Sequence, residues 1–255
     1  EDISKLKNNK YNIVFDVSGR ELEDTKILMV NINNSFERYV YVSSAGVYKE
    51  NTELPLIESD EIDIQSRHRG KFQTENWLLE KNIPFTSFRP TYIYGPQNYN
   101  KIENWFFERI INLKKVPIPG DGSLITQLGH VSDLTDVMIK CLNYEKANKN
   151  IYNISGEKGI TIKGLILKCA EACNIDQGQL ELIEFDYKNL DTRSRKSFPI
   201  RLDHYLTSIS KVKNDLNWEP KFDLLSGLKN SYENDFKFKL NDEFDKTLDD
   251  VLYKY

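Results

Sequence analysis

The chain has 255 residues, of which 39% are hydrophobic and 12% aromatic, so we expect one large α/β domain or two interleaved smaller ones with a sizeable core. No run of eighteen or more apolar residues is present, and no charged segment followed by an apolar stretch opens the chain, so neither a membrane span nor a secretory signal is predicted. The net charge of −4 excludes a general attraction for nucleic acid, and any RNA binding must use local basic patches.

The first part of the chain alternates between short apolar runs and helical patterns, as expected for a parallel sheet with crossover helices. Lys71 lies early in a predicted helix, and Tyr94-Gly95-Pro96 ends the last strand of this part. The predicted elements are strands over 11–16, 38–44 and 86–93, and helices over 24–32 and 71–81.

The second part mixes amphipathic helices with short strands and turn-rich connections. Cys141, Cys169 and Cys173 form an odd set, two of them on an apolar helical pattern, and we expect buried free thiols in a reducing compartment. The expected elements are helices over 102–113, 132–142 and 162–173, a turn-rich connection over 117–122, and strands over 151–154 and 180–185.

Four segments in order resemble the extended short-chain dehydrogenases/reductases, and together they cover nearly the whole chain. They are 42–48 (VSSAGVY), 67–71 (RHRGK), 89–96 (RPTYIYGP) and 216–220 (LNWEP). The resemblance implies an α/β fold with a Rossmann-like parallel sheet and a smaller C-terminal α/β substrate-type domain. We expect the Rossmann-like domain over 1–96, with 129–145 packing back on it, and the smaller interleaved domain over 97–255.

The same resemblance assigns roles to particular residues. Ser44 and Lys71 match the family's serine and lysine, but Arg67 stands four residues before Lys71, where the family has its acid/base tyrosine. A guanidinium does not deprotonate near neutral pH, so the usual hydride-transfer and epimerase machinery is not expected. Lys71, Pro90 and Tyr92 correspond to positions beside the dinucleotide.

No Gly-rich phosphate loop follows the first readable strand, and the first glycine is Gly19. Because that strand looks like the family's fourth, we expect the first βαβ units to lie outside this sequence. NAD(P) binding is then expected only if that region retains the Gly-rich loop.

A more specific resemblance is carried by five segments. They are 66–71 (SRHRGK), 89–100 (RPTYIYGPQNYN), 105–107 (WFF), 127–131 (QLGHV) and 152–158 (YNISGEK). They are similar to the chloroplast stem-loop-binding proteins and their cyanobacterial relatives. The resemblance implies RNA association, endoribonuclease activity assisted by a divalent metal in some members, a plastid stroma or cyanobacterial cytoplasm, ribosomal or transcription-associated ribonucleoprotein partners, and a homo-oligomer.

Two basic clusters offer contacts for phosphates. The first contains Arg67, His68, Arg69 and Lys71, and the second contains Arg193, Arg195, Lys196, Arg201 and His204. For RNA cleavage, the candidate catalytic residues are Ser44, Arg67, His68 and Lys71, because strand scission needs a proton acceptor and cations for the developing phosphorane charge. The alternative is that both clusters are solvated surface charge.

A metal site is less clearly indicated. Asp133 and Asp136 lie three residues apart and could hold one Mg²⁺ through water, or Asp133 caps a helix and Asp136 is solvated. His130 is expected to be a structural hydrogen-bonding residue. No His, Cys and carboxylate cluster has metal-ligand spacing, so a tight structural metal is not predicted, whereas Mg²⁺ at an RNA phosphate stays compatible.

The sequence therefore favours an RNA-binding protein of atypical short-chain dehydrogenase fold, with magnesium-assisted cleavage of stem-loop RNA as the finer hypothesis. Two alternatives stay open. One is an NAD(P)-dependent nucleotide-sugar epimerase or dehydratase, suggested by Ser44 and Lys71. The other is a non-catalytic ribonucleoprotein scaffold.

Overall fold

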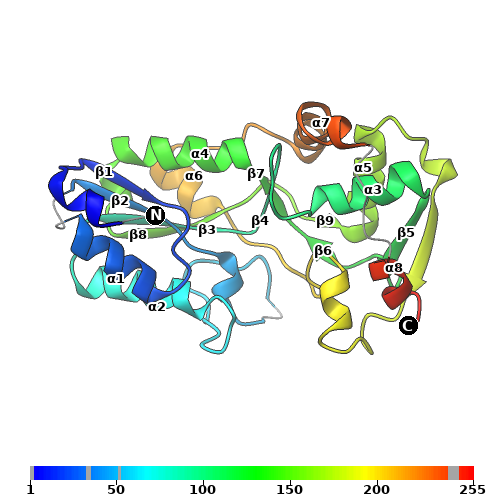
Figure 1. The fold of residues 1–255 in the computed structure, drawn as a ribbon, viewed down its shortest axis with the longest axis horizontal. Helices are drawn as coiled ribbons and strands as arrows, with labels where there is room; N and C mark the ends of the chain where they lie inside the picture. Colours follow the sequence, from blue (N-terminus) through cyan, green and yellow to red (C-terminus); the bar gives the residue numbers. More distant parts are fainter. Residues whose placement is uncertain (1–2, 33–35, 51–52, 241–246) are drawn as a thin grey trace. The chain divides into compact units, whose positions relative to one another are not determined.

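The computed structural model of the protein describes residues 3–32, 36–50, 53–240 and 247–255 (Figure 1). The chain divides into two units, and it passes between them several times. Unit 1 contains Glu1–Thr91, Leu134–Ile154 and Thr207–Glu219; unit 2 contains Tyr92–Asp133, Ser155–Leu206 and Pro220–Tyr255. Residues 207–219 therefore belong to unit 1, although the sequence analysis assigned them to the second domain.

Unit 1 is built on a four-stranded parallel sheet with the order β1-β2-β3-β8. Its central strands are buried along their length because helices cover both faces, which explains their aromatic and β-branched composition. This is the Rossmann-like parallel sheet that the sequence predicts. The strands are β1 (Ile13–Asp16), β2 (Arg38–Val42), β3 (Phe85–Pro90) and β8 (Asn150–Ile154).

Helices α1 and α2 cover one face of this sheet, and α4 and α6 cover the other (Figure 1). Part of the core between the sheet and its helices is formed by Met29, Tyr39, Tyr41, Leu78 and Phe85, each at most 2% exposed. The helices are α1 (Leu22–Asn31), α2 (Arg69–Glu80), α4 (Val131–Lys140) and α6 (Ser210–Leu216), and the short 3-10 segments are η1 (Ile3–Asn8), η2 (Ala45–Val47), η3 (Cys141–Asn143) and η4 (Glu145–Ala147).

In its described residues, unit 2 contains three separate strand pairs. The pairs β4–β7 and β5–β10 are parallel, whereas β6–β9 is antiparallel. The strands are β4 (Tyr92–Tyr94), β5 (Lys115–Pro119), β6 (Ile125–Thr126), β7 (Leu128–His130), β9 (Ile160–Thr161) and β10 (Glu181–Phe185).

Aromatic side chains form the centre of unit 2. Trp105 and Phe106 on α3 contact Phe198 with ring centroids 5.2 and 6.1 Å apart, both edge to face. These contacts fix the segment that follows β10 against α3. The helices of unit 2 are α3 (Glu103–Asn112), α5 (Ile162–Ala172), α7 (Leu224–Asn234) and α8 (Thr247–Leu252), with η5 (Gln177–Gln179), η6 (Ser194–Ser197) and η7 (Phe236–Lys239).

Two sequence-based expectations for local structure are wrong. The strand predicted over 86–93 is broken: β3 ends at Pro90, Thr91 donates its N–H to Ile154, and β4 pairs with β7 in unit 2. The turn-rich connection over 117–122 begins inside β5, which tolerates Pro117 and Pro119 because it lies in a two-stranded sheet and needs ladder hydrogen bonds on one side only.

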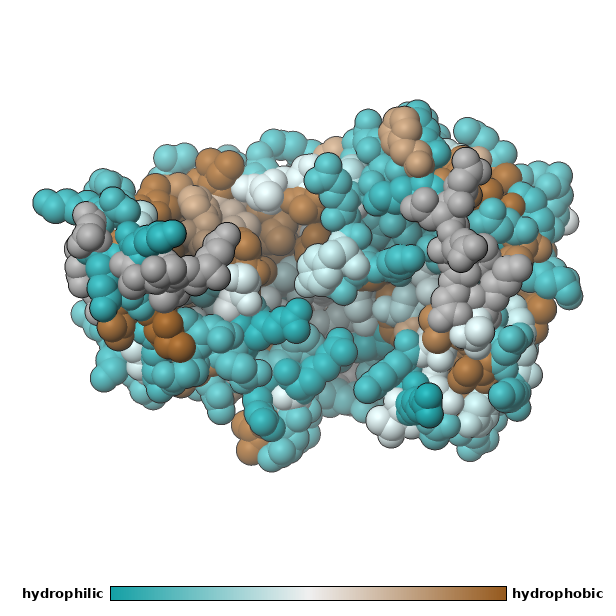
Figure 2. Space-filling view, viewed as in Figure 1, coloured by the Kyte–Doolittle hydropathy of each residue, from teal (hydrophilic) through white to brown (hydrophobic). Residues whose placement is uncertain are grey.

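Cys141, Cys169 and Cys173 are buried free thiols, as predicted. Among the described residues, no helix has the length and apolar character needed to cross a bilayer. The face drawn in Figure 2 is mostly hydrophilic, with separate apolar areas, in keeping with a chain of which 29% of the residues are charged.

Candidate nucleic-acid interface

The end of β2 leads into the segment that carries Ser44. The Ser44 Oγ accepts a hydrogen bond from Gly46 N at 3.0 Å and thereby caps η2. The Gly46 carbonyl accepts a hydrogen bond from Ser66 Oγ at 2.7 Å, and a side chain at Gly46 would overlap the His68 ring. Gly46 therefore brings Ser44 and His68 together, because only a residue without a Cβ permits this close approach.

Arg67 and His68 precede the first turn of α2. The Arg67 Nε donates to His68 Nε2 at 3.0 Å, which requires that imidazole nitrogen to be unprotonated. The His68 backbone N–H donates to Ser66 Oγ at 3.1 Å, and the same hydroxyl donates to the Gly46 carbonyl. Ser66 therefore links the backbone of His68 to that of Gly46. Arg67 and Arg69 are exposed. This end of α2 thus presents two guanidinium groups beside one imidazole.

Lys71 lies inside unit 1 rather than on its surface with the two arginines. Its Nζ donates to the Val42 carbonyl at 2.6 Å and lies 4.9 Å from the centroid of the Tyr41 ring. Burial lowers the pKa of Lys71, and the charges of Asp16 and Glu75 partly oppose this effect. One of the three ammonium donors is therefore committed to the backbone at the end of β2.

The second basic cluster lies in unit 2, around η6. Asp191 organises it by accepting hydrogen bonds from Arg193 N at 2.7 Å and Ser194 N at 2.9 Å. Hydrogen bonds to Ser194 and Arg193 lower the pKa of Asp191. Arg193, Arg195 and Lys196 are exposed, and the neighbouring Phe198 is anchored against α3.

Arg201 and His204 are held more closely than the rest of that cluster. The Arg201 guanidinium lies over the Tyr205 ring, 4.5 Å from its centroid, and its backbone N–H donates to Tyr92 Oη at 2.7 Å. His204 accepts a hydrogen bond from Ile125 N at 3.1 Å through Nδ1. The cluster therefore combines three exposed cations with a half-buried Arg201 and an exposed His204 that is hydrogen-bonded to the backbone.

The residues beside the family's dinucleotide have other partners in this chain. Pro90 is the buried last residue of β3, the Tyr92 hydroxyl accepts from Arg201, and Lys71 donates to Val42. The sequence offers no Gly-rich loop for a pyrophosphate.

The alternative in which Asp133 caps a helix and Asp136 is solvated is wrong. The Asp133 carboxylate accepts from the backbone N–H groups of Lys221 at 2.9 Å and Phe222 at 3.2 Å, and Asp136 accepts from Trp218 Nε1 at 3.0 Å. Within the described ranges, no group of three or more His, Cys, Asp or Glu residues is arranged to hold a metal. His130 Nδ1 accepts from Ser132 N at 3.2 Å, in keeping with a structural role.

The sequence did not predict a buried ion pair that the structure shows in unit 1. Arg89 donates to Glu75 with its Nη2 2.7 Å from Oε2, and the two side chains are 3% and 0% exposed. Arg89 Nη1 also donates to Tyr48 Oη at 3.0 Å, and Tyr48 donates to Asn153 Oδ1 at 2.7 Å. Burial raises the pKa of Tyr48 to about 12. Tyr48 is therefore a neutral packing residue.

The sequence model of the NAD dependent epimerase/dehydratase family matches residues 24–155, which is more than half of the chain. The chain belongs to this family, and the resemblance identified from its motifs is confirmed.

Among curated proteins, the chain is 42% identical over 250 residues to the "Chloroplast stem-loop binding protein of 41 kDa b, chloroplastic" of Arabidopsis thaliana, covering 98% of this chain and 65% of that protein. It is 24% identical over 211 residues to the UDP-glucose 4-epimerase of Vibrio cholerae, covering 78% and 63%. The chain thus spans less than two thirds of the length of these relatives.

Solved structures show the same fold. The UDP-glucose 4-epimerase of Thermotoga maritima superposes with a TM-score of 0.74 at 22% identity, covering 94% of this chain and 83% of that one. The UDP-N-acetylglucosamine 4-epimerase of Methanobrevibacter ruminantium gives a TM-score of 0.74 at 20% identity, covering 94% and 80%. At these identities the likeness establishes the fold alone.

Proposed function

We propose that the protein binds stem-loop RNA through the exposed cations of its two basic clusters. The observation that carries the proposal is the pair of exposed arginines, Arg67 and Arg69, beside the half-buried His68 at the start of α2, where the family's acid/base tyrosine is replaced by a cation. The 42% identity to a chloroplast protein named for stem-loop binding supports the same reading. The segment with Arg193, Arg195 and Lys196 adds three exposed charges in unit 2.

Binding is tested by filter or fluorescence titration of a labelled RNA hairpin at several salt concentrations. A five-site variant replaces Arg67, Arg69, Arg193, Arg195 and Lys196 with glutamine and leaves the half-buried Lys71 in place. We expect it to lose hairpin affinity and to have a shallower dependence of log K on log salt, by about one unit for each phosphate contact removed.

A matched control removes the same charge from other exposed positions. The control variant replaces Lys5, Lys10, Lys146, Lys229 and Lys237 with glutamine. The control retains the affinity and salt slope of the parent protein if the clusters are the binding surface. Equal losses in the two variants, or binding by the parent that does not respond to salt, would contradict the proposal.

RNA cleavage is the finer form of this proposal. His68 Nε2, released from its hydrogen bond with Arg67 when the Arg67 guanidinium moves to the phosphate, accepts the proton of a 2′-hydroxyl; the oxygen attacks the adjacent phosphorus, and the 5′-oxygen leaves with a proton from water or from the imidazolium. Arg67 and Arg69 stabilise the charge of the phosphorane, and Mg²⁺ acts as an RNA-bound counterion. The products are a 2′,3′-cyclic phosphate and a 5′-hydroxyl.

This step predicts that His68→Gln abolishes cleavage and leaves hairpin affinity within about twofold, because the charge of the cluster is unchanged. Product ends on a sequencing gel, with and without Mg²⁺, provide the measurement. Cleavage that persists at the parent rate in this variant excludes the role of His68. Binding without cleavage in the parent protein favours the ribonucleoprotein scaffold.

A nucleotide-sugar enzyme is the second candidate, because the chain belongs to the epimerase/dehydratase family and has Ser44 and Lys71 at the matching positions. It requires NAD(P) and an acid/base other than Arg67. Bound nicotinamide absorbance, or a thermal shift on addition of NAD(P) and a nucleotide sugar to the longest native form, would support it. No shift would count against it.

The relative's name supports a plastid location for the protein, with a cyanobacterial cytoplasm as the alternative. A homo-oligomer and ribonucleoprotein partners stay part of the proposal. Size-exclusion chromatography with light scattering, with and without RNA, tests both.

A further inference from the structure

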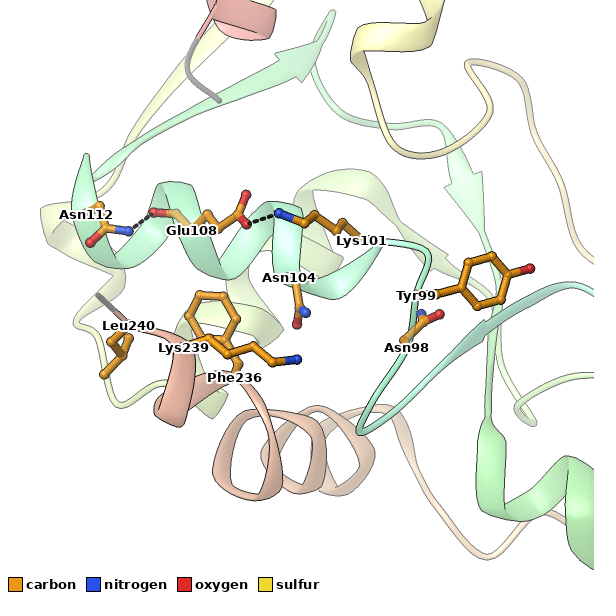
Figure 3. A pocket seen from close by; sticks show the side chains of 9 residues that line it. All are labelled: Asn98, Tyr99, Lys101, Asn104, Glu108, Asn112, Phe236, Lys239 and Leu240. Atoms are coloured by element: carbon orange, nitrogen blue, oxygen red, sulfur yellow. Dashed lines mark hydrogen bonds and ion pairs between the residues drawn. The ribbon is translucent and has the colours of Figure 1, made fainter. Parts of the chain in front are cut away.

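A pocket of about 330 Å³ lies in unit 2 between α3 and η7 (Figure 3). Its α3 wall is formed by Asn104, Glu108 and Asn112, which share one face of the helix because they are spaced by four residues. The opposite face of the helix buries Phe106. The volume is at the lower end of the range for small-ligand sites, about 300–1,000 Å³.

The charged side chains around the pocket are paired with one another. Lys101 contacts Glu108 at 3.3 Å, and Lys239 contacts Asp235 at 2.7 Å. Paired charges of both signs leave little net field for a phosphate or a carboxylate. The pocket is therefore suited to a neutral polar group.

One polar atom in the pocket lacks a partner. Asn104 is 6% exposed, and its Oδ1 accepts no hydrogen bond from the part of the chain that the structure describes. In Figure 3, the Asn104 side chain extends from α3 toward η7, where Phe236 and Lys239 lie. A buried amide oxygen without a donor is costly, and a ligand N–H would satisfy it once rotation of the Asn104 side chain turns the oxygen into the pocket.

Aromatic rings complete the lining. Phe236 is buried at the wall formed by η7, and Tyr99, at one end of the pocket, is 82% exposed. Figure 3 shows the Tyr99 ring turned away from the other lining side chains, and a rotamer change of this exposed side chain brings its face to a flat heterocycle at the pocket. The combination of a side-chain amide, an exposed ring and balanced charge is the chemistry that recognises a nucleobase in single-stranded RNA.

We propose that this pocket binds the base of an unpaired nucleotide of the RNA, with Asn104 accepting an N–H from the base edge and Tyr99 stacking on the ring. The inference rests on the proposed RNA binding and deepens it. The clusters contact phosphates, and the pocket distinguishes unpaired loop nucleotides from the paired stem. Paired nucleotides are excluded because their base edges are occupied and their faces are stacked.

Helix α3 contacts both the pocket and the segment that carries the second basic cluster. The face of α3 opposite the pocket packs Phe106 against Phe198, which directly follows η6 with Arg195 and Lys196. Unit 2 therefore carries a base-binding site and backbone-binding cations on one helix and the segment anchored to it.

The test compares a hairpin that has an unpaired loop with a fully paired duplex of the same stem. We expect Asn104→Leu and Tyr99→Ala each to weaken hairpin binding about tenfold, with duplex affinity and salt slope unchanged. Tyr99→Phe retains the ring and is expected to bind as the parent does. Asn234→Leu, an exposed asparagine on α7, is the matched control, and thermal unfolding confirms that each variant is folded.

Two further experiments identify the class of ligand. Cross-linking of a 4-thiouridine in the loop to a peptide containing Tyr99 supports the proposal. Protection of that peptide by methyl glucoside in place of RNA overturns it in favour of a sugar site. Parent-like hairpin binding by both pocket variants also overturns it, even when the five-site variant has lost binding. If the parent protein binds neither RNA, the proposed function itself fails.

Discussion

At the scale of single residues, the Arg89–Glu75 ion pair of unit 1 is almost fully buried. Arg89→Met leaves the Glu75 carboxylate buried without its cation, and we expect a loss of about 3–5 kcal/mol in the free energy of unfolding. Lys49→Met breaks an ion pair to Glu61 whose side chains are 57% and 73% exposed, and we expect a loss of less than about 1 kcal/mol. Urea denaturation measures the unfolding free energy of both variants. Similar losses would show that the buried ion pair does not contribute more stability than the exposed one.

Glu103 gives a pH-dependent prediction. Its carboxylate accepts hydrogen bonds from Gly95 N at 2.9 Å and Ser231 Oγ at 2.8 Å, yet burial raises its pKa above the ordinary value of 4.5. A carboxyl with a raised folded pKa contributes stability that is complete below the unfolded pKa and is lost as the pH rises through the folded pKa.

Glu103→Gln removes this titration. The unfolding free energy of the parent minus that of the variant should therefore decrease as the pH rises from about 4 toward neutrality. Denaturation curves at a series of pH values provide the measurement, with the exposed Glu233→Gln as the control. A difference that stays constant or increases with pH would show that the Glu103 pKa is not raised.

At the scale of elements, periodicity predicted most of the sheet and the longer helices of the fold. It predicted α3, for example, because apolar residues recur along 102–113. It missed β5, since Pro117 and Pro119 are typical of turns and only the pairing with β10 makes a strand there. The pocket was missed too, although Asn104, Glu108 and Asn112 at a spacing of four form a polar stripe on an otherwise buried helix.

Helix α8 is attached to unit 2 by an ion pair between Asp249 and Arg109 and by the buried side chain of Leu252. It has six residues, too few to be stable alone, and Asp249 accepts hydrogen bonds from Arg109 Nε at 2.8 Å and Nη2 at 2.6 Å. Asp249→Asn removes the buried carboxylate, and we expect amide exchange in α8 to become at least about 100-fold faster. The exposed neighbour Asp250→Asn is the control, and unchanged protection in both variants would show that packing alone holds the helix.

At the scale of the whole molecule, the sequence identified the family and the segment at the start of α2. It did not indicate that Lys71 turns inward to Val42 while Arg67 and Arg69 stay exposed, because side-chain direction at a helix start depends on the loop packed against it. The contact of His68 with Gly46 is of the same kind: it joins two segments that are separate in the sequence.

The net charge of −4 leads to a last prediction about association with RNA. Exposed acidic residues outside the clusters repel phosphates over distances comparable to the Debye length, and replacing Glu50, Glu80, Glu184 and Glu233 with glutamine brings the net charge from −4 to 0. We expect the association rate with hairpin RNA to rise about two- to tenfold at about 50 mM salt and to approach the parent rate at about 300 mM. The dissociation rate should not change, since none of the four residues belongs to the clusters. Stopped-flow fluorescence separates the two rates, and slower dissociation would place the acidic residues at the interface itself.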